Sequence, residues 1–305
     1  MAPLRILVFS RRHTSVGWMS SFPHVRGQVL ADALRGLGQE AEFRSLPVAG
    51  HWDAAVCSDY QGDQRWLDEL VRRMAGLSAT RLFCLADGGT TGLAERQMSD
   101  WFARRGGVLC HLREWPLAPF ERYVGLGVGD DVRYDPTRPR RAVLFDFPRS
   151  TTIDTSRGFA RERLDAVRRA HPGCRLLGSG PADSPIRDAF DAWIPYGQAH
   201  ADYVAHFAGC LAFVPGCQES MGLAIAEAQV AGAAIVAPPG WVKAEMLVPA
   251  AAAIDEDLVG GIARAAARDG TAIAREAAER FSAAAMAERV LAAIEESLAH
   301  PLPAP

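Results

Sequence analysis

Residues 218–239 read QESMGLAIAEAQVAGAAIVAPP, and this stretch decides the fold class of the chain. The apolar run just before it, residues 210–216, is typical of a buried strand, and a helix pattern starts near Met221 and ends at Gly232. A second apolar run, AAIVAPPGW, follows that glycine. The order strand, helix, strand indicates an α/β protein with a parallel sheet.

Two glutamates, Glu219 and Glu227, flank the start of this helix. Glu227 follows about two turns after Glu219, so it falls on much the same helix face and can accept hydrogen bonds from a diol such as a ribose. One glutamate would hold the sugar and the other the nucleoside. We predict Ser220 as the N-cap. That cap leaves the first backbone N–H groups free for an anionic or hydroxyl-rich ligand, namely those of Met221, Gly222 and Leu223. An ordinary capped helix with one solvated acid is the plainer alternative.

The same order of glutamates, small residues, glycine and strand resembles the E-x7-E donor-site signature of retaining glycosyltransferases with the GT-B fold (group 1, family 4-like). The resemblance covers the second half of the chain and implies two Rossmann-like domains whose parallel sheets face a central cleft. It implies an acceptor-binding domain over residues 1–135 and a nucleotide-sugar donor-binding domain over 136–285. Residues 286–305 would form a helix and tail that brace the N-terminal domain.

Composition agrees with two globular domains. The chain has 305 residues, of which 49% are hydrophobic, enough to supply two cores. A net charge of −3 gives no general attraction to nucleic acid. No apolar run is long enough for a membrane span, so we expect a soluble protein. Four of the six cysteines lie in or beside apolar runs, as free thiols do in a reducing cytoplasm, and the use of arginine over lysine indicates a bacterial source.

Strand and helix patterns alternate along both halves. In the first half we predict helices near residues 24–37, 65–75 and 93–104 between the strands PLRILVFS, AEFRSL, DAAVC, TRLFCLA and GVLCHL. After the proline- and arginine-rich YDPTRPRR, we predict helices near 157–170 and 201–207 among the strands AVLFDF, CRLLGSG, DAWIPYG and CLAFVPG. The alanine-rich residues 271–300 predict one or two further helices.

The resemblance assigns donor-site roles in the second half. Arg149 matches the arginine that neutralises the donor diphosphate, but the lysine that follows it in the family is missing here. Gly178 matches a glycine-bearing loop beside the nucleotide, and Tyr196 matches the next element, where it can stack on the base. Lys243 and Glu245 match the loop over the donor. A surface arginine at position 149 and a core aromatic at position 196 are the plainer alternatives.

Fewer residues of the first half can be assigned. Arg26 stands where relatives carry a small residue, so it can reach a phosphate or an acidic acceptor; a surface arginine at a helix start is the alternative. Asp87 and His111 each follow an apolar strand, and His13 follows the first one, so all three are expected at carboxyl ends of strands. One of them would assist the transfer, and for each an ordinary satisfied polar residue is the alternative.

These features predict a retaining, metal-independent glycosyltransferase of the hexosyltransferase type. It would move a sugar from a nucleotide-diphosphate sugar, its co-substrate, to a hydroxyl or amine of a small or carrier-borne acceptor. Glu219 would bind sugar hydroxyls, while Arg149 and the helix N-terminus would stabilise the leaving diphosphate, so no metal or other cofactor is expected. The alternatives are a nucleotide-sugar epimerase or pseudo-glycosyltransferase of the same fold, or a degenerate nucleotide-binding protein without catalysis. Nucleotide, sugar and oligomeric state are left open.

Overall fold

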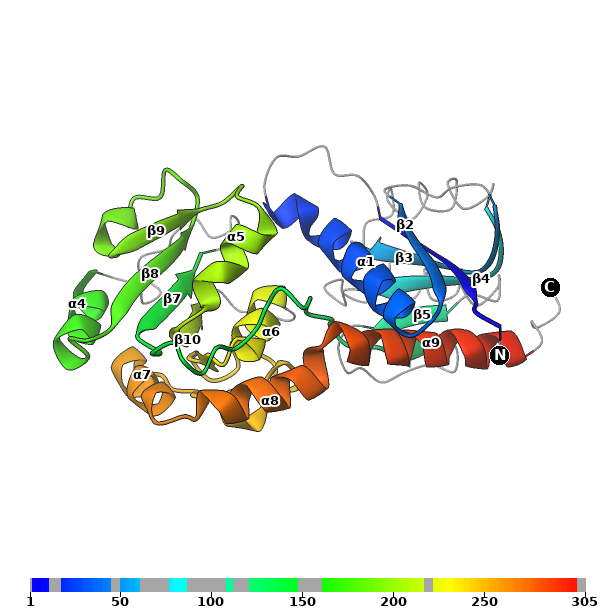
Figure 1. The fold of residues 1–305 in the computed structure, drawn as a ribbon. Helices are drawn as coiled ribbons and strands as arrows, with labels where there is room; N and C mark the ends of the chain where they lie inside the picture. Colours follow the sequence, from blue (N-terminus) through cyan, green and yellow to red (C-terminus); the bar gives the residue numbers. More distant parts are fainter. Residues whose placement is uncertain are drawn as a thin grey trace. The chain divides into compact units, whose positions relative to one another are not determined.

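The structure is a computed structural model that describes residues 2–10, 18–44, 50–60, 77–86, 108–111, 121–147, 161–216 and 222–300. The chain divides into two units. Unit 1 consists of residues 1–129 and 281–305, and unit 2 of residues 130–280. Each unit has its own parallel sheet (Figure 1). No helix in the described ranges is long and apolar enough to cross a membrane.

The sheet of unit 1 has the strand order β2-β1-β3-β4-β5-β6, and every pair is parallel. Its strands are β1 (Arg5–Phe9), β2 (Glu40–Arg44), β3 (His51–Tyr60), β4 (Ser78–Ala86), β5 (Val108–His111) and β6 (Glu121–Tyr123). The central strands are buried on both faces and therefore read as continuous apolar runs. The first five confirm the predicted strands, whereas β6 was not predicted.

Two described helices pack on this sheet. Helix α1 (Trp18–Gly36) contacts β1, β2 and β3, and α9 (Ala283–Ala299) contacts β4, β5 and α1. Helix α1 begins six residues earlier than predicted, because Pro23 lies inside the helix instead of starting it. Pro23 is the sixth residue of α1, where its missing N–H removes one intrahelical hydrogen bond.

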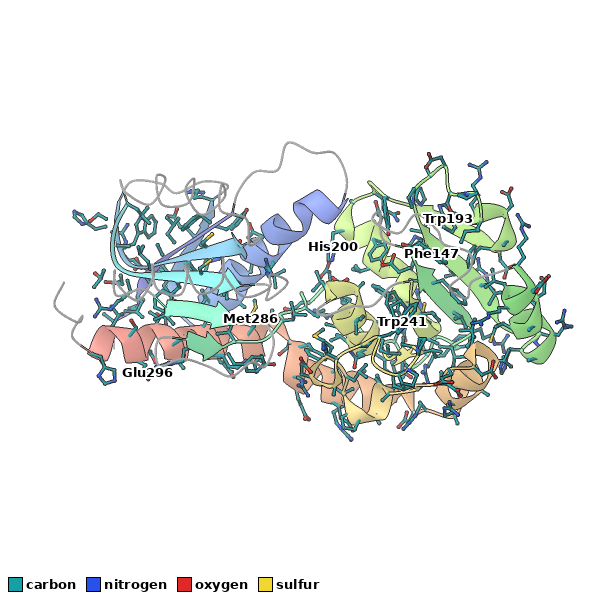
Figure 2. All side chains as sticks on the ribbon, turned by 180° about the vertical axis from the view of Figure 1, so that it is seen from behind. Phe147, Trp193, His200, Trp241, Met286 and Glu296 are labelled. Carbon is teal, nitrogen blue, oxygen red and sulfur yellow. The ribbon has the colours of Figure 1, made fainter. Side chains whose placement is uncertain are left out.

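Helix α9 is tied to the sheet of unit 1 at its C-terminal end. Arg81 of β4 is 6% exposed and donates hydrogen bonds to the backbone carbonyls of Ser297 and His300, at 3.0 and 2.7 Å. The last carbonyls of a helix have no intrahelical donor, so Arg81 satisfies them. Arg122 of β6 forms a bidentate ion pair with Glu296, in which Nε donates to Oε2 and Nη2 donates to Oε1. Glu296 is labelled in Figure 2. The end of the chain is therefore a structural part of unit 1.

The sheet of unit 2 has the strand order β11-β10-β7-β8-β9, again all parallel. Its strands are β7 (Ala142–Asp146), β8 (Arg175–Gly180), β9 (Ala192–Pro195), β10 (Cys210–Pro215) and β11 (Ala234–Ile235), and they confirm the strands predicted for this half. The helices of this unit are α4 (Arg161–Ala170), α5 (His200–Val204), α6 (Leu223–Val230), α7 (Leu258–Ala266) and α8 (Gly270–Phe281).

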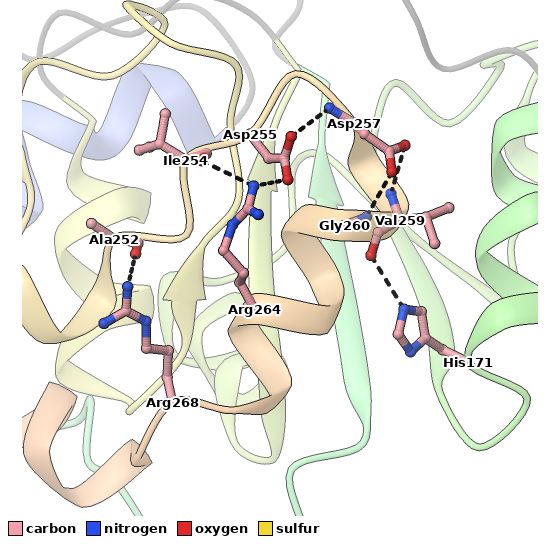
Figure 3. Close-up of polar contacts among 9 residues, drawn as sticks. All are labelled: His171, Ala252, Ile254, Asp255, Asp257, Val259, Gly260, Arg264 and Arg268. Carbon is pink, nitrogen blue, oxygen red and sulfur yellow. Dashed lines mark hydrogen bonds and ion pairs between the residues drawn. The ribbon is translucent and has the colours of Figure 1, made fainter.

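Helix α7 begins with a side-chain cap, drawn in Figure 3. The Asp257 carboxylate accepts hydrogen bonds from the backbone N–H groups of Val259 and Gly260, at 3.3 and 3.0 Å. Asp255 pairs with Arg264 and accepts a hydrogen bond from the Asp257 N–H. Asp255 and Asp257 form an aspartate-x-aspartate triplet, a spacing that can hold a metal ion. Here both carboxylates have protein partners, and the described residues contain no metal-binding group of three or more His, Cys, Asp or Glu side chains.

We expect Asp257→Ala to lower the stability of α7 by about 1 kcal/mol, because two N–H groups of its first turn lose their acceptor. Asp257→Asn keeps a capping oxygen and should stay close to wild type. Amide hydrogen exchange over residues 258–266 measures the effect. Glu256→Ala, a change at the exposed neighbouring position, is the control, and an equal loss in that variant would contradict the cap.

Candidate active site

In the sheet of unit 2, the direction in which successive strands are added reverses between β7 and β10. From β7 the chain winds outward through β8 and β9, and then crosses to the other side to form β10 and β11. In open α/β sheets, ligands bind beyond the carboxyl ends of the strands at such a switch point. Strand β7 ends at Asp146 and β10 at Pro215, so these two positions mark where a ligand site is expected.

Gly216, which follows β10, lies directly against the carboxyl end of β7. A Cβ atom on Gly216 would be 2.2 Å from the carbonyl oxygen of Asp146 and 3.0 Å from the ring of Phe147. Only a residue without a side chain fits there. The chain continues through residues 217–221, which lie outside the described residues, and is described again from Gly222.

A buried polar cluster surrounds the end of β7. Ser179 of β8 donates a hydrogen bond from Oγ to Asp146 Oδ1 at 2.6 Å. The hydroxyl of Tyr196 donates a hydrogen bond to the carbonyl oxygen of Phe147 and lies beside the Asp146 carboxylate. Tyr203 of α5 is 1% exposed and lies close enough to Asp146 for the charge of that carboxylate to act on its phenol. We call Asp146, Ser179, Tyr196 and Tyr203 the Asp146 cluster.

Burial raises the pKa of Asp146 from 3.8 to about 6, while hydrogen bonds from Ser179 and Tyr196 oppose the rise and the Glu227 carboxylate adds to it. Burial likewise raises the pKa of Tyr203 well above its ordinary value, so this phenol keeps its proton at neutral pH. An acid that titrates near neutrality at the switch point of a sheet is typical of a functional site.

This pKa has a consequence for stability. Because the folded-state pKa of Asp146 lies above the unfolded value, Asp146 contributes stability below about pH 4 and loses that contribution as the pH rises through about 6. We expect Asp146→Asn to remove this component, so that its stability relative to wild type increases from pH 4 to pH 6.5. Urea unfolding over that range measures the difference. The exposed Asp188→Asn is the control, and parallel curves for wild type and Asp146→Asn would contradict the shift.

A second buried carboxylate, Glu227 of α6, lies beside the Asp146 cluster. Its side chain is 2% exposed, and its Oε1 lies 2.6 Å from Nε2 of His200, at the start of α5 (Figure 2). Nδ1 of His200 lies 3.5 Å from Oδ2 of Asp131. The imidazole therefore has a carboxylate at each nitrogen, an arrangement that favours its doubly protonated, cationic form.

Glu227 and His200 shift each other's pKa. Burial raises the pKa of Glu227, while the hydrogen bond and charge of His200 oppose that rise. Burial alone would lower the pKa of His200, but the hydrogen bond and charge of Glu227, together with Asp131, outweigh it and raise the pKa. Each partner therefore favours the charged form of the other: His200 favours the ionised carboxylate of Glu227, and Glu227 favours the cationic imidazole of His200.

The helix that carries Glu227 begins later than predicted. Gly222 is the N-cap, no side chain caps the helix, and its first residue is Leu223. The predicted N-cap at Ser220 and helix start near Met221 are therefore wrong. By helix geometry the N–H groups of Leu223 and Ala224 have no acceptor within the helix, so the free donors begin two residues further along.

Gly178 lies within β8, so the predicted glycine-bearing loop is a strand. A Cβ atom on Gly178 would be 2.5 Å from the ring of Trp193. That ring stacks on Phe147, with centroids 6.0 Å apart and planes 15° apart (Figure 2). Close packing against the Trp193 ring explains the glycine. Of the residues after β11, Lys243 is exposed and Glu245 is partly buried, and within the described residues neither forms a hydrogen bond or ion pair with Glu227.

In unit 1, Arg26 of α1 is 2% exposed, so the alternative of a surface arginine is wrong. Next to it, a Cβ atom on Gly27 would be 2.5 Å from the Phe43 ring and 2.7 Å from Ser58 Oγ, so this part of α1 lies tightly on the sheet. His111 is the last residue of β5, and its side chain is not described. Six predicted site residues lie outside the described residues: His13, Asp87, Arg149, Glu219, Ser220 and Met221.

Sequence reasoning missed Asp146, Ser179, Tyr203 and His200. Asp146 carried a usable signal, because it follows an apolar run in the same way as Asp87 does. His200 carried none, since it lies in a polar turn and meets Glu227 only through the tertiary fold.

A separate cavity of about 360 Å³ lies where α4 meets the start of α7. It is lined by Arg163, Ala166, Glu256, Asp257, Leu258 and Val259. No residue of the Asp146 cluster lines it, and Asp257 is engaged in capping α7. The arrangement around Glu227 is therefore the stronger candidate site.

No protein-family model matches this sequence, and no curated protein matches it. Solved structures match over nearly the whole chain. AviGT4, a glycosyltransferase involved in avilamycin A biosynthesis, is 14% identical with a TM-score of 0.60, covering 98% of this chain and 99% of that one. HepE of Anabaena in complex with UDP and glucose is 12% identical with a TM-score of 0.57, covering 96% and 99%. A glycosyltransferase from Rickettsia africae is 10% identical with a TM-score of 0.59, covering 99% and 100%. The fold is therefore GT-B, as predicted.

Proposed function

We propose that this chain is a glycosyltransferase that takes a sugar from a nucleotide-diphosphate sugar. The observation that carries the proposal is the ion-paired, buried Glu227 at the carboxyl edge of the second sheet, beside the switch point. The GT-B fold supports it, and HepE, which shares that fold, has been solved with UDP-glucose. Free, buried thiols at Cys57, Cys84, Cys110 and Cys210 fit a reducing compartment, so we place the enzyme in a bacterial cytoplasm.

In this proposal residues 136–285 bind the donor. Glu227 accepts hydrogen bonds from the ribose diol, and Tyr196 lies beside the base. Glu219 binds hydroxyls of the transferred sugar. Arg149 and the free N–H groups at the start of α6 stabilise the diphosphate. Residues 1–135 bind the acceptor, and residues 286–305 brace that domain.

The remaining roles fall to residues of the first domain and to the loop after β11. Lys243 and Glu245 cover the donor, and Arg26 and His13 bind a phosphate or an acidic part of the acceptor. His111 or Asp87 assists the transfer.

The reaction we propose is transfer with retention of anomeric configuration and without a required metal ion. The acceptor oxygen or nitrogen forms a bond to the anomeric carbon while the bond from that carbon to the diphosphate oxygen breaks. The leaving diphosphate takes the acceptor proton, and the positive end of α6 with Arg149 stabilises its charge. Activity should therefore persist in the presence of EDTA.

The test is a thermal-shift screen with nucleoside diphosphates and their sugars, on wild type and Glu227→Gln. A ligand that binds only the folded state raises the melting temperature, by RT ln(1 + [L]/Kd) in free energy. We expect stabilisation by at least one nucleotide, and its loss in Glu227→Gln but not in Glu279→Gln, an exposed glutamate of α8. If no nucleotide stabilises wild type, the proposed function is wrong.

Product analysis then separates the enzymes that share this fold. With the nucleotide that binds, release of nucleoside diphosphate together with a glycosylated acceptor identifies a glycosyltransferase. A rearranged sugar still attached to its nucleotide identifies an epimerase, and a coupled product without a sugar identifies a pseudo-glycosyltransferase. Binding without turnover identifies the degenerate protein.

A further inference from the structure

The ion pair between His200 and Glu227 joins two elements of unit 2 that are far apart in sequence. His200 begins α5, and Glu227 lies in the second half of α6. The distance of 2.6 Å between Nε2 and Oε1 is that of a short charge-assisted hydrogen bond. With 2% of Glu227 and 17% of His200 exposed, solvent screens this pair little.

Glu227 depends on His200 for its charge. An isolated carboxylate at this depth would take up a proton, because burial penalises the charged form. His200 supplies both a donor and a positive charge. Asp131, whose side chain is 44% exposed, faces the other ring nitrogen at 3.5 Å and fixes the orientation of the imidazole. Asp131, His200 and Glu227 thus form a chain of contacts from the exposed Asp131 to the buried Glu227 carboxylate.

The hydrogen bond from His200 engages one oxygen of the Glu227 carboxylate. Within the described residues, Oε2 of Glu227 receives no hydrogen bond. An ionised carboxylate oxygen that is fixed in place and open to a further donor can accept hydrogen bonds from adjacent hydroxyls. A ribose supplies two such hydroxyls, and a 2′,3′-dideoxyribose supplies neither.

We propose that His200 is the positioning residue that makes this site select ribonucleoside diphosphates, by holding Glu227 so that Oε2 meets the 2′- and 3′-hydroxyls. The inference rests on the proposed function, in which Glu227 binds the ribose. His200 itself touches no substrate. Its contribution is to keep Glu227 ionised and to restrict it to one rotamer before the nucleotide arrives.

The probes are UDP, ADP and GDP, each with its 2′,3′-dideoxy counterpart, and the dissociation constants come from calorimetry. The two members of a pair carry the same diphosphate, so the ratio of their dissociation constants cancels phosphate ionisation. For wild type we expect the dideoxy form to bind about 10-fold more weakly or worse at pH 7. His200→Ala should bring the ratio below about 2-fold. His200→Gln keeps an N–H donor without charge and should restore part of it.

The pH profile of the ratio separates positioning from a merely structural role. The titratable groups that face the pair are Asp131, Asp146 and Tyr203. Asp146 titrates at about 6, and burial raises the pKa of Tyr203 well above its ordinary value. Above pH 7 Asp146 is ionised and Tyr203 keeps its proton, so a change in the ratio there reports on His200. The wild-type ratio should fall as the pH rises and the imidazolium loses its proton, whereas that of His200→Gln should stay flat.

His206→Gln is the matched control, because His206 lies in the short turn that follows α5. This variant should keep the wild-type ratio of dissociation constants and its pH profile. Equal ratios in wild type, His200→Ala and His200→Gln would overturn the positioning role while nucleotide binding stands. A wild-type ratio of one would overturn it as well, because Glu227 would then not contact the diol. If wild type binds none of the probes, the inference falls together with the proposed function.

Discussion

Gly216→Ala is expected to destabilise unit 2 by about 4 kcal/mol or more, the largest effect of any single methyl group added to the described residues of this site. The added Cβ would lie 2.2 Å from the carbonyl oxygen of Asp146. The atom it meets belongs to the backbone of a central strand, so it cannot turn away as a side chain would. The ends of β7 and β10 must separate, and the hydrogen bond from Ser179 to Asp146 is disturbed with them.

Amide hydrogen exchange resolves this effect by unit. Protection of residues 142–146 and 210–215 should fall in Gly216→Ala, while that of β1 and β3 in unit 1 stays at the wild-type level. Gly173→Ala is the matched control, because a Cβ there has no heavy atom within 4 Å. Wild-type protection of β7 in Gly216→Ala would contradict the close approach.

Gln229→Leu is expected to destabilise the same unit by about 4 kcal/mol, although leucine has nearly the same size. Gln229 is fully buried on α6, two residues after Glu227. Its Nε2 donates to the carbonyl oxygen of Met246 at 2.8 Å, and its Oε1 accepts from the N–H of Val248 at 2.8 Å. Leucine would leave both backbone groups buried without a partner, and each orphaned group costs about 1–3 kcal/mol.

Urea unfolding measures this loss of stability, and amide hydrogen exchange over residues 244–251 locates it. Gln28→Leu is the control, since Gln28 is an exposed glutamine of α1 and its replacement should change stability by less than about 0.5 kcal/mol. A similarly small change in Gln229→Leu would show that the amide does not join α6 to this segment.

The sequence predicts every described strand except β6, which lies at one edge of the sheet of unit 1. Strands such as β1, β7 and β10 are buried on both faces, so their residues are apolar without interruption and the pattern is unmistakable. Strand β6, by contrast, is three residues long, reads Glu-Arg-Tyr and, within the described part of unit 1, pairs only with β5. Its pairing is carried by backbone hydrogen bonds, which leave no trace in side-chain periodicity. The helix start at Leu223 was missed because a side-chain cap was expected where none is used.

For the candidate site, the spacing of Glu219 and Glu227 drew attention to α6. The burial of Glu227 and its pairing with His200 become visible only in the fold. A carboxylate that looks like a solvated acid in sequence is 2% exposed, because α5 places His200 over it. Such a pairing between residues 27 positions apart has no local signature. The packing reason for Gly178 is equally non-local, since it depends on where the Trp193 ring lies.

Unit 1 is closed by a helix from the far end of the chain, and this sets the order in which the two units can be completed during synthesis. A ribosome has delivered every residue of unit 2 once it has passed residue 280, and unit 2 can then fold as one continuous piece. The sheet of unit 1 emerges first but lacks α9, and with it the partners of Arg81 and Arg122. The N-terminal unit is therefore expected to be the last to mature, and a released chain truncated after residue 280 should show a protease-resistant second unit and a sensitive first one.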